Sequence, residues 1–270
     1  MRGRDLSKPF RGVYVAGTQD LSYVDRCAAL LQKLPPDVFL CSFSAARVLG
    51  VPLPIRLESS MLVHVGVHAP GSPPVGRGIR GHELGFDEWQ IIERAGLAIT
   101  APGETWCSLG AHLSLAELVG AGDFLIRRDA PLTTREALRE CVAAWKGKRG
   151  VKNLRDAIEL LNDRSESVKE SELRVLLVRA GFAGLEANFP IRTSGGYDYR
   201  GDLAFPQRKL IIEYQSAFHE TPERFRADMT RISRLDADEW KVMQVNKDDM
   251  RTPTELLARI ERTLASRPYY

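Results

Sequence analysis

Apolar residues in the C-terminal part of the chain follow two spacings, one typical of helices and one of strands. Apolar positions three and four residues apart predict helices over Val168–Ala180, Pro222–Leu235 and Pro253–Ser266. Short apolar or alternating runs predict strands at Leu185–Ile191, Tyr199–Phe205, Lys209–Tyr214 and Trp240–Val245. Helices before, between and after these strands predict an α/β sandwich around a central mixed sheet.

The preceding part of the chain predicts a second mixed α/β domain. Helical patterns cover Asp20–Leu34, Ser42–Leu49, Pro102–Leu109, Ser114–Leu125, Thr133–Ala144 and Val151–Asn162, with Ser42 and Thr134 as expected caps. Strand patterns cover Gly12–Ala16, Ser60–Val67, Ile79–Glu83 and Gln90–Ile92. The polar stretch Asn162–Ser167 interrupts the pattern. A chain of 270 residues suits two domains, and we expect them over residues 1–163 and 164–270.

Charge and cysteine content narrow the classes of protein only slightly. The net charge is +3, which permits a nucleic-acid partner without requiring one. The four cysteines lack the close spacing of a zinc site, and no secretory signal precedes them. No run reaches the roughly 18 apolar residues that span a bilayer. We therefore expect reduced thiols, a cytoplasmic location and no membrane partner. The oligomeric state stays open, with a homodimer as one option.

Basic residues gather in two segments. One contains Lys146, Lys148, Arg149, Lys152 and Arg155, and the other contains Arg224, Arg226, Arg231 and Arg234. Either segment could bind nucleic-acid phosphates, and either could equally be the solvated face of a helix. Because a helix turns about 100° per residue, the four arginines of the second segment cannot all share one face. We expect Arg231 to point inward with Asp228, and Arg224 or Arg234 to face solvent.

The strand Lys209–Tyr214 carries the most informative chemistry. Its apolar run Leu210–Ile212 ends in Glu213 and Gln215, which share one face because strand side chains alternate. An isolated buried carboxylate is costly unless a cation or a hydrogen-bond donor offsets it. In a hairpin of this length, Asp202 on the preceding strand can meet Glu213. Two carboxylates and an amide oxygen suit Mg²⁺ (or Mn²⁺), although a surface hairpin with solvated acids is the plain alternative.

These residues resemble the PD-(D/E)XK superfamily of restriction-endonuclease-like proteins, in particular the group related to very-short-patch-repair endonucleases. The resemblance covers about 80 residues from Ser167 onward and rests on Glu170, Arg174, Asp202, Glu213, His219, Asp228 and Arg231. It implies a nuclease fold in which Asp202 and Glu213 bind the metal. Glu170, Gln215 and His219 would complete the catalytic set. Arg174 would tie the acids together, and it and the basic segments are the candidate contacts to DNA.

Two positions depart from the pattern of that group. Gln215 stands where the motif usually ends in lysine, and Gln215-Ser216 replaces a frequent Asp-Gly pair. The site then has one carboxylate fewer than expected, so it is either a variant nuclease or inactive. Two plainer interpretations also stay open. Glu170 and Arg174, four residues apart, could form an ordinary surface ion pair, and His219 could be a polar surface group.

The N-terminal domain resembles the antitoxins of the AbiEi type. The segments Cys41–Pro52, Gly96–Leu109 and Leu115–Asp123 carry this resemblance, which implies a winged-helix-like start that binds DNA. The helix Ser42–Leu49 offers only Arg47 for reading bases, so a packing scaffold is an equal alternative.

Three functions of different classes follow from the sequence. The first is a metal-dependent DNA endonuclease or nickase that hydrolyses phosphodiester bonds. The second is a non-catalytic DNA-binding regulator or antitoxin that keeps a nuclease fold as a scaffold. The third is a protein-interaction module without affinity for nucleic acids. Fold alone does not decide among them.

Overall fold

The computed structural model describes residues 6–16, 21–85, 90–215 and 221–270. The chain divides into two compact units. The first comprises Met1–Leu125 and Pro131–Glu159, and the second comprises Ile126–Ala130 and Leu160–Tyr270. Both contain helices and mixed sheets, which confirms the predicted mixed α/β fold. Among the described residues, no helix is long and apolar enough to cross a membrane.

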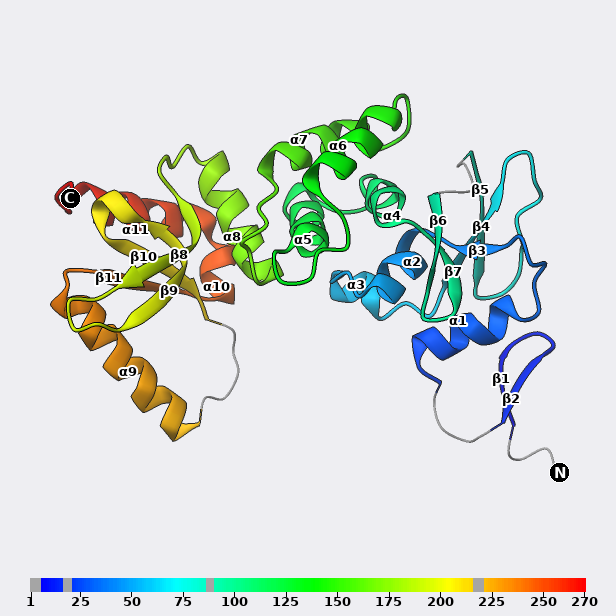
Figure 1. Cartoon of the computed structure of the whole chain (residues 1–270), viewed down its shortest axis with the longest axis horizontal. Coiled ribbons are helices and arrows are strands. Elements are labelled where there is room, and N and C mark those ends of the chain that lie inside the picture. Colours follow the sequence, from blue (N-terminus) through cyan, green and yellow to red (C-terminus); the bar gives the residue numbers. More distant parts are fainter. Residues whose placement is uncertain (1–5, 17–20, 86–89, 216–220) are drawn as a thin grey trace. The chain divides into compact units, whose positions relative to one another are not determined.

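A mixed five-stranded sheet organises the first unit (Figure 1). Its strand order is β5 (Ile79–Leu84), β4 (Val63–His68), β3 (Phe39–Leu40), β7 (Leu97–Thr100) and β6 (Ile91–Arg94). The β4–β5 and β3–β7 pairs are parallel. A separate hairpin joins β1 (Leu6–Phe10) and β2 (Val13–Ala16). The helices are α1 (Tyr23–Leu31), α2 (Ser42–Leu49), α3 (Ile55–Glu58), α4 (Pro102–Leu109), α5 (Leu115–Ile126), α6 (Arg135–Ala144) and α7 (Val151–Leu160). The resemblance to a winged helix remains a prediction.

Local capping explains where these helices begin and end. Thr134 caps α6 as predicted, because its hydroxyl accepts a hydrogen bond from the amide of Ala137. The prediction that Ser42 caps α2 is wrong. Cys41 holds the cap position, and Ser42 is the first helical residue, with a φ of 50°. Gly50 ends α2 in the left-handed conformation that glycine adopts without steric cost.

The second unit contains a four-stranded sheet in the order β11-β10-β9-β8. Strands β8 (Glu186–Arg192), β9 (Asp198–Phe205) and β10 (Leu210–Tyr214) form an antiparallel meander. Helix α9 (Pro222–Ala237) follows β10, and β11 (Lys241–Val245) then pairs with β10 in parallel. Helix α8 (Val168–Arg179) precedes the sheet, whereas α10 (Lys247–Arg251) and α11 (Pro253–Ala265) follow it.

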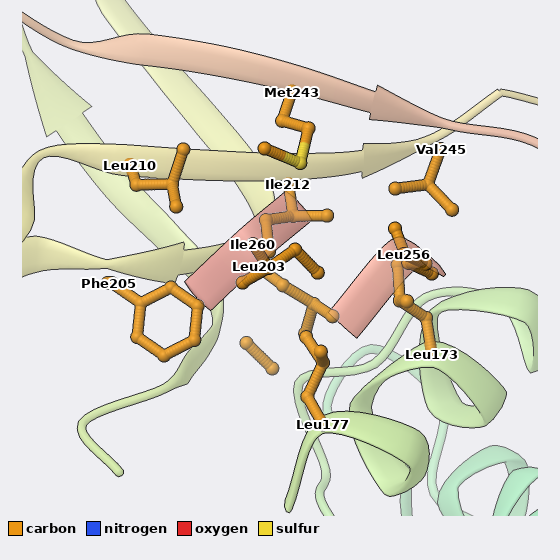
Figure 2. Close-up of a cluster of buried hydrophobic side chains, with 11 residues drawn as sticks. Leu173, Leu177, Leu203, Phe205, Leu210, Ile212, Met243, Val245, Leu256 and Ile260 are labelled. Carbon is orange, nitrogen blue, oxygen red and sulfur yellow. The ribbon is translucent and has the colours of Figure 1, made fainter. Parts of the chain in front are cut away.

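The alternation of side chains in β10 separates two apolar layers. Leu210 and Ile212 pack with residues of α8 and α11, as Figure 2 shows. Ile211 faces the other way and packs with Leu235 of α9. Because side chains alternate, Glu213 belongs to the same face as Ile211, toward α9. The carboxylate at the end of this strand is therefore presented to the helix that carries the second basic segment.

Candidate active site

Four polar residues lie at one level across the sheet of the second unit. The ladder between β9 and β10 ends at the pair Leu203–Ile212, and Asp202 and Glu213 are the next residues of the two strands. Glu213 in turn pairs with Gln244 of β11. On the other side of β9, the register places Asn188 of β8 at the level of Asp202. The predicted arrangement of Asp202 and Glu213 on adjacent strands is confirmed, and the row extends to Asn188 and Gln244, which sequence reasoning missed.

The carboxylate of Asp202 lies where the ladder between β9 and β10 ends. Its Oδ2 accepts a hydrogen bond of 3.0 Å from the amide of Tyr214, in place of a main-chain acceptor. Burial and the negative charges of Glu170 and Glu213 raise the pKa of Asp202 to about 7, against a smaller opposing effect of the Tyr214 amide and Arg231. The carboxyl groups of Glu170 and Glu213 thus both act on that of Asp202, and Arg231 does not offset them.

The carboxylate of Glu213 is paired with a fixed cation. Its side chain is buried, with the residue 7% exposed, and Arg231 of α9 donates to both of its oxygens at 2.7 Å. Arg231 also donates to Oδ1 of Asp228, at 2.9 and 2.7 Å. Burial tends to lower the pKa of Arg231, but pairing with Glu213 and Asp228 raises it above its usual value. The expectation that Arg231 points inward with Asp228 is confirmed.

Glu170 reaches the site from the first turn of α8. Ser167 caps this helix by accepting from the Glu170 amide, and the residue is buried. Its Oε2 accepts from the amide of Glu166 at 3.0 Å and from the side chain of Asn188 at 3.3 Å. Asn188 has a φ of 46°, a left-handed conformation that asparagine tolerates better than most residues, and it also donates to the Arg164 carbonyl. This kink in β8 joins the sheet to the start of α8.

Arg174 lies inside the second unit rather than on a surface. It is 6% exposed, and it donates to the carbonyl of Leu160 at 2.6 Å and to the hydroxyl of Ser165 at 3.4 Å. The predicted contact between Arg174 and DNA would require an exposed side chain, and Arg174 is buried. The guanidinium instead holds the segment that enters α8, and so it helps to position Glu170.

The remaining predicted site residues are spread more widely. Gln215 is half-buried directly after β10, and its amide donates to the Val245 carbonyl at 2.7 Å. His219 lies outside the described residues. Among the described residues, no group of three or more His, Cys, Asp or Glu has an arrangement that could hold a metal ion. A metal at Asp202 and Glu213 therefore remains a prediction, with two protein carboxylates as its ligands.

The predicted DNA-binding residues occupy different settings. Arg224 is exposed on the first turn of α9, and Arg226 is exposed but paired with Glu223. Arg234 stacks on the ring of Tyr197 at 3.6 Å and donates to the Tyr199 hydroxyl. In the first unit, the exposed residues Lys146, Lys148 and Arg149 lie between α6 and α7. On α9, Arg224 is therefore the arginine best placed to meet a phosphate.

Comparison with known proteins finds relatives without an assigned function. No family model matches the chain. The chain is similar to proteins of Mycobacterium tuberculosis, strains CDC 1551 / Oshkosh and ATCC 25618 / H37Rv, that are named only as uncharacterized. In both cases the identity is 29% over 264 residues, which cover 96% of this chain and 92% of the relative. The similarity spans both units and leaves the activity to be inferred from the site.

The two missed residues had weak signals in the sequence. Asn188 interrupts a run between Ala187 and Phe189, and Gln244 interrupts another between Met243 and Val245. An amide in the middle of a short apolar strand is uncommon, since it needs a hydrogen-bond partner when buried. Half-buried Asn188 has Glu170 as its partner, whereas Gln244 is exposed and donates to Asp228 at 3.4 Å.

The raised pKa of Asp202 predicts a pH-dependent stability. Between its ordinary pKa of 3.8 and its folded pKa of about 7, the folded protein holds a proton that the unfolded chain has released. The resulting stabilisation is complete below pH 3.8 and is lost as the pH rises through 7. Asp202→Asn keeps a neutral acceptor for the Tyr214 amide. In metal-free buffer, the free energy of unfolding of the variant should match that of wild type near pH 3.8. Above pH 7 it should exceed that of wild type by up to about 4 kcal/mol.

Denaturation of both proteins at several pH values tests this expectation. Asp198→Asn on the same strand is the matched control, because that carboxylate is 71% exposed and should show no comparable dependence. An equal difference between Asp202→Asn and wild type across the whole pH range would show that Asp202 has the same pKa in the folded and unfolded protein.

Proposed function

We propose that the second unit is a metal-dependent DNA endonuclease or nickase that hydrolyses phosphodiester bonds. The observation that carries this proposal is the half-buried carboxyl of Asp202, which lies on the strand next to that of Glu213 and whose pKa is raised by burial and by Glu170 and Glu213. Buried acids that repel one another are costly for stability and are characteristic of functional sites. A divalent cation would relieve this repulsion and hold Asp202 in its ionised form.

The residues present fit Mg²⁺ or Mn²⁺ in their chemistry. Mg²⁺ binds proteins through one or two carboxylates and keeps several waters, which matches Asp202 and Glu213. When bound, such an ion polarises a phosphate and makes a bound water easier to deprotonate. Both oxygens of Glu213 are hydrogen-bonded to Arg231, so metal binding requires this pair to loosen. Glu170 adds negative charge, and Gln215 would orient the attacking water.

Cleavage of a panel of DNAs tests this function. Duplex, nicked, mismatched, branched and single-stranded DNA are incubated with the full chain in Mg²⁺, in Mn²⁺ and in a chelator. The proposal expects cleavage of at least one form that depends on the metal. Binding of Mn²⁺, followed by its electron paramagnetic resonance signal, gives a second readout that does not depend on choosing the right substrate.

Arg224 should contribute one phosphate contact. It is exposed on α9, and the structure shows no ion pair for it with another described residue. We expect Arg224→Ala to lower the salt dependence of DNA binding, with the slope of log K against log salt falling by about one. Arg192→Ala is the control, because Arg192 is equally exposed on β8 but paired with Asp198. Affinity that does not respond to salt would refute an electrostatic mode of binding.

A second function is supported by the pairing of Glu213. An acid whose two oxygens are both held by a fixed guanidinium needs no metal for its neutralisation. This arrangement favours a non-catalytic DNA-binding regulator or antitoxin, in which the ion pair stabilises a scaffold. Tight DNA binding without metal-dependent cleavage of any DNA in the panel, together with no Mn²⁺ binding, would favour this second function.

A further inference from the structure

The first unit contains a cavity of about 230 Å³ that is rich in groups able to bind an anion. Its walls include Ser42, His82, Ser108, His112, Lys148 and Arg149. These residues come from four separate places in the chain: the start of α2, strand β5, helix α4 with the segment after it, and the segment between α6 and α7. The fold thus brings two imidazoles, two hydroxyls and two cations to one cavity.

The imidazoles around this cavity form a packed group. Nδ1 of His64 lies 2.9 Å from Nε2 of His82, and their rings stack at 5.1 Å between centroids. The ring of Phe43 contacts His64 at 5.2 Å and His112 at 5.3 Å. Contacts on several sides hold these rings in place, so the donors they offer to a ligand are preorganised.

The charges near these imidazoles are positive. Burial and the neighbouring charges of His82, Arg80 and His112 lower the pKa of His64 to about 4. Burial and Arg80 also lower the pKa of His82, and burial, Arg149 and Arg80 lower that of His112. A neutral imidazole still donates one N–H bond, and the positive charges that add to the effect of burial on these pKa values favour an anion.

Ser42 gives a second, independent indication of a ligand. It is only 5% exposed, lines the cavity and has a φ of 50°, a conformation that is strained for serine. Within the described part of the chain, its hydroxyl has no hydrogen-bond partner, and no side chain caps the eight-residue helix α2. The start of a helix carries a partial positive charge and amides that bind phosphate well.

A larger cavity of about 550 Å³ adjoins the first. Both are lined by Glu104, Trp145 and Lys148, and the larger one adds the small side chains of Ala101 and Ala137. Two acids oppose an anion: Glu104, which lines both cavities, and Glu140, which lines the larger one. Oε1 of Glu104 accepts from Gln90 at 3.0 Å and from Cys141 at 3.5 Å. A ligand that fills both cavities would have an anionic group and an organic part.

We propose that the first unit binds a small phosphate monoester, with its phosphate against His82, His112, Arg149 and the start of α2. The organic part occupies the larger cavity beside Trp145. This site is separate from the candidate active site and needs no metal. Its test can therefore succeed or fail independently of the nuclease proposal.

Isothermal titration calorimetry of the full chain with adenosine 5′-monophosphate, in a chelator, tests the site. Adenosine and inorganic phosphate are titrated separately. We expect saturable binding of the monophosphate, weaker binding of phosphate and little binding of adenosine. Arg149→Gln should weaken binding by about tenfold or more, since it removes charge-assisted hydrogen bonds. Ser42→Ala should weaken it several-fold, and thermal melting verifies that each variant is folded.

Lys146→Gln is the matched control, because Lys146 is exposed in the same segment but lines neither cavity. Equal losses in Lys146→Gln and Arg149→Gln would overturn the proposal in favour of diffuse charge. Absence of saturable binding, or equal binding of adenosine and its monophosphate, would overturn it as well. Competition by an oligonucleotide with a 5′-phosphate, but not by its 5′-hydroxyl form, would support the site and identify a nucleic-acid end as the source of the phosphate.

Discussion

Asp202→Ala and Glu213→Ala are each expected to reduce metal-dependent DNA cleavage by about a hundredfold to a thousandfold or more. Phosphodiester hydrolysis places negative charge on the phosphate oxygens, and a metal held by these two carboxylates is the strongest positive group that the site could offer. Cleavage rates of the DNA form that wild type attacks measure the effect. Mn²⁺ binding should be lost in parallel, whereas DNA binding in a chelator should persist.

Asp198→Ala is the matched control for this loss. Asp198 belongs to the same strand as Asp202, but its carboxylate is exposed and paired with Arg192 at 3.0 Å. Its replacement should leave cleavage unchanged. Gln215→Lys introduces the lysine with which the PD-(D/E)XK motif usually ends, and a variant nuclease should tolerate it or become faster. Cleavage that survives in Asp202→Ala would place the metal elsewhere, and the proposed site would have to be abandoned.

Arg231→Met is expected to cause the largest loss of stability in the second unit. It leaves the buried carboxylate of Glu213 and that of Asp228 without their shared cation. Removing one partner of a buried ion pair costs about 3–5 kcal/mol, and the Arg231 side chain is 20% exposed, so we expect the lower part of this range. Hydrogen exchange of the β10 and β11 amides measures the change within this unit.

Two further variants separate this ion pair from general effects of substitution on α9. Arg226→Met removes an arginine that is 70% exposed and paired with Glu223, so it should cost less than about 1 kcal/mol. The double variant Arg231→Met with Glu213→Gln should recover part of the loss, because it removes the unpaired charge. No recovery would mean that the aliphatic part of Arg231, rather than its charge, stabilises the helix.

The elements of the second unit were largely predictable because their patterns are local. The run Leu210–Ile212 is buried as its composition indicates, and the register of β9 and β10 follows from the short turn at Pro206–Arg208. The placement of Asp202 opposite Glu213 follows from that register. The inward direction of Arg231 was predictable from helix geometry together with the family resemblance, and its contact with Asp228 is observed.

Other features depend on contacts between distant segments, so local sequence patterns do not predict them. The left-handed conformation of Asn188 has no local cause, because its partner Glu170 lies 18 residues earlier in the chain. Strand β3 has only two residues and exists through pairing with β4 and β7. Serine is a favoured residue at the N-cap position, yet Cys41 holds that position in α2 and Ser42 follows it as the first helical residue. Arginine is usually found on the surface, yet Arg174 is buried and donates a hydrogen bond to the Leu160 carbonyl.

The order of strands in the second unit has a consequence for how the protein folds. Strands β8, β9 and β10 are neighbours both in the chain and in the sheet, so their pairing closes only short loops. The parallel pairing of β11 with β10 closes a longer loop, because the connection between the two strands contains α9. We therefore expect Glu213 to enter the sheet before Arg231 and Gln244 reach it. An ion pair that forms late in folding slows unfolding more than it speeds folding.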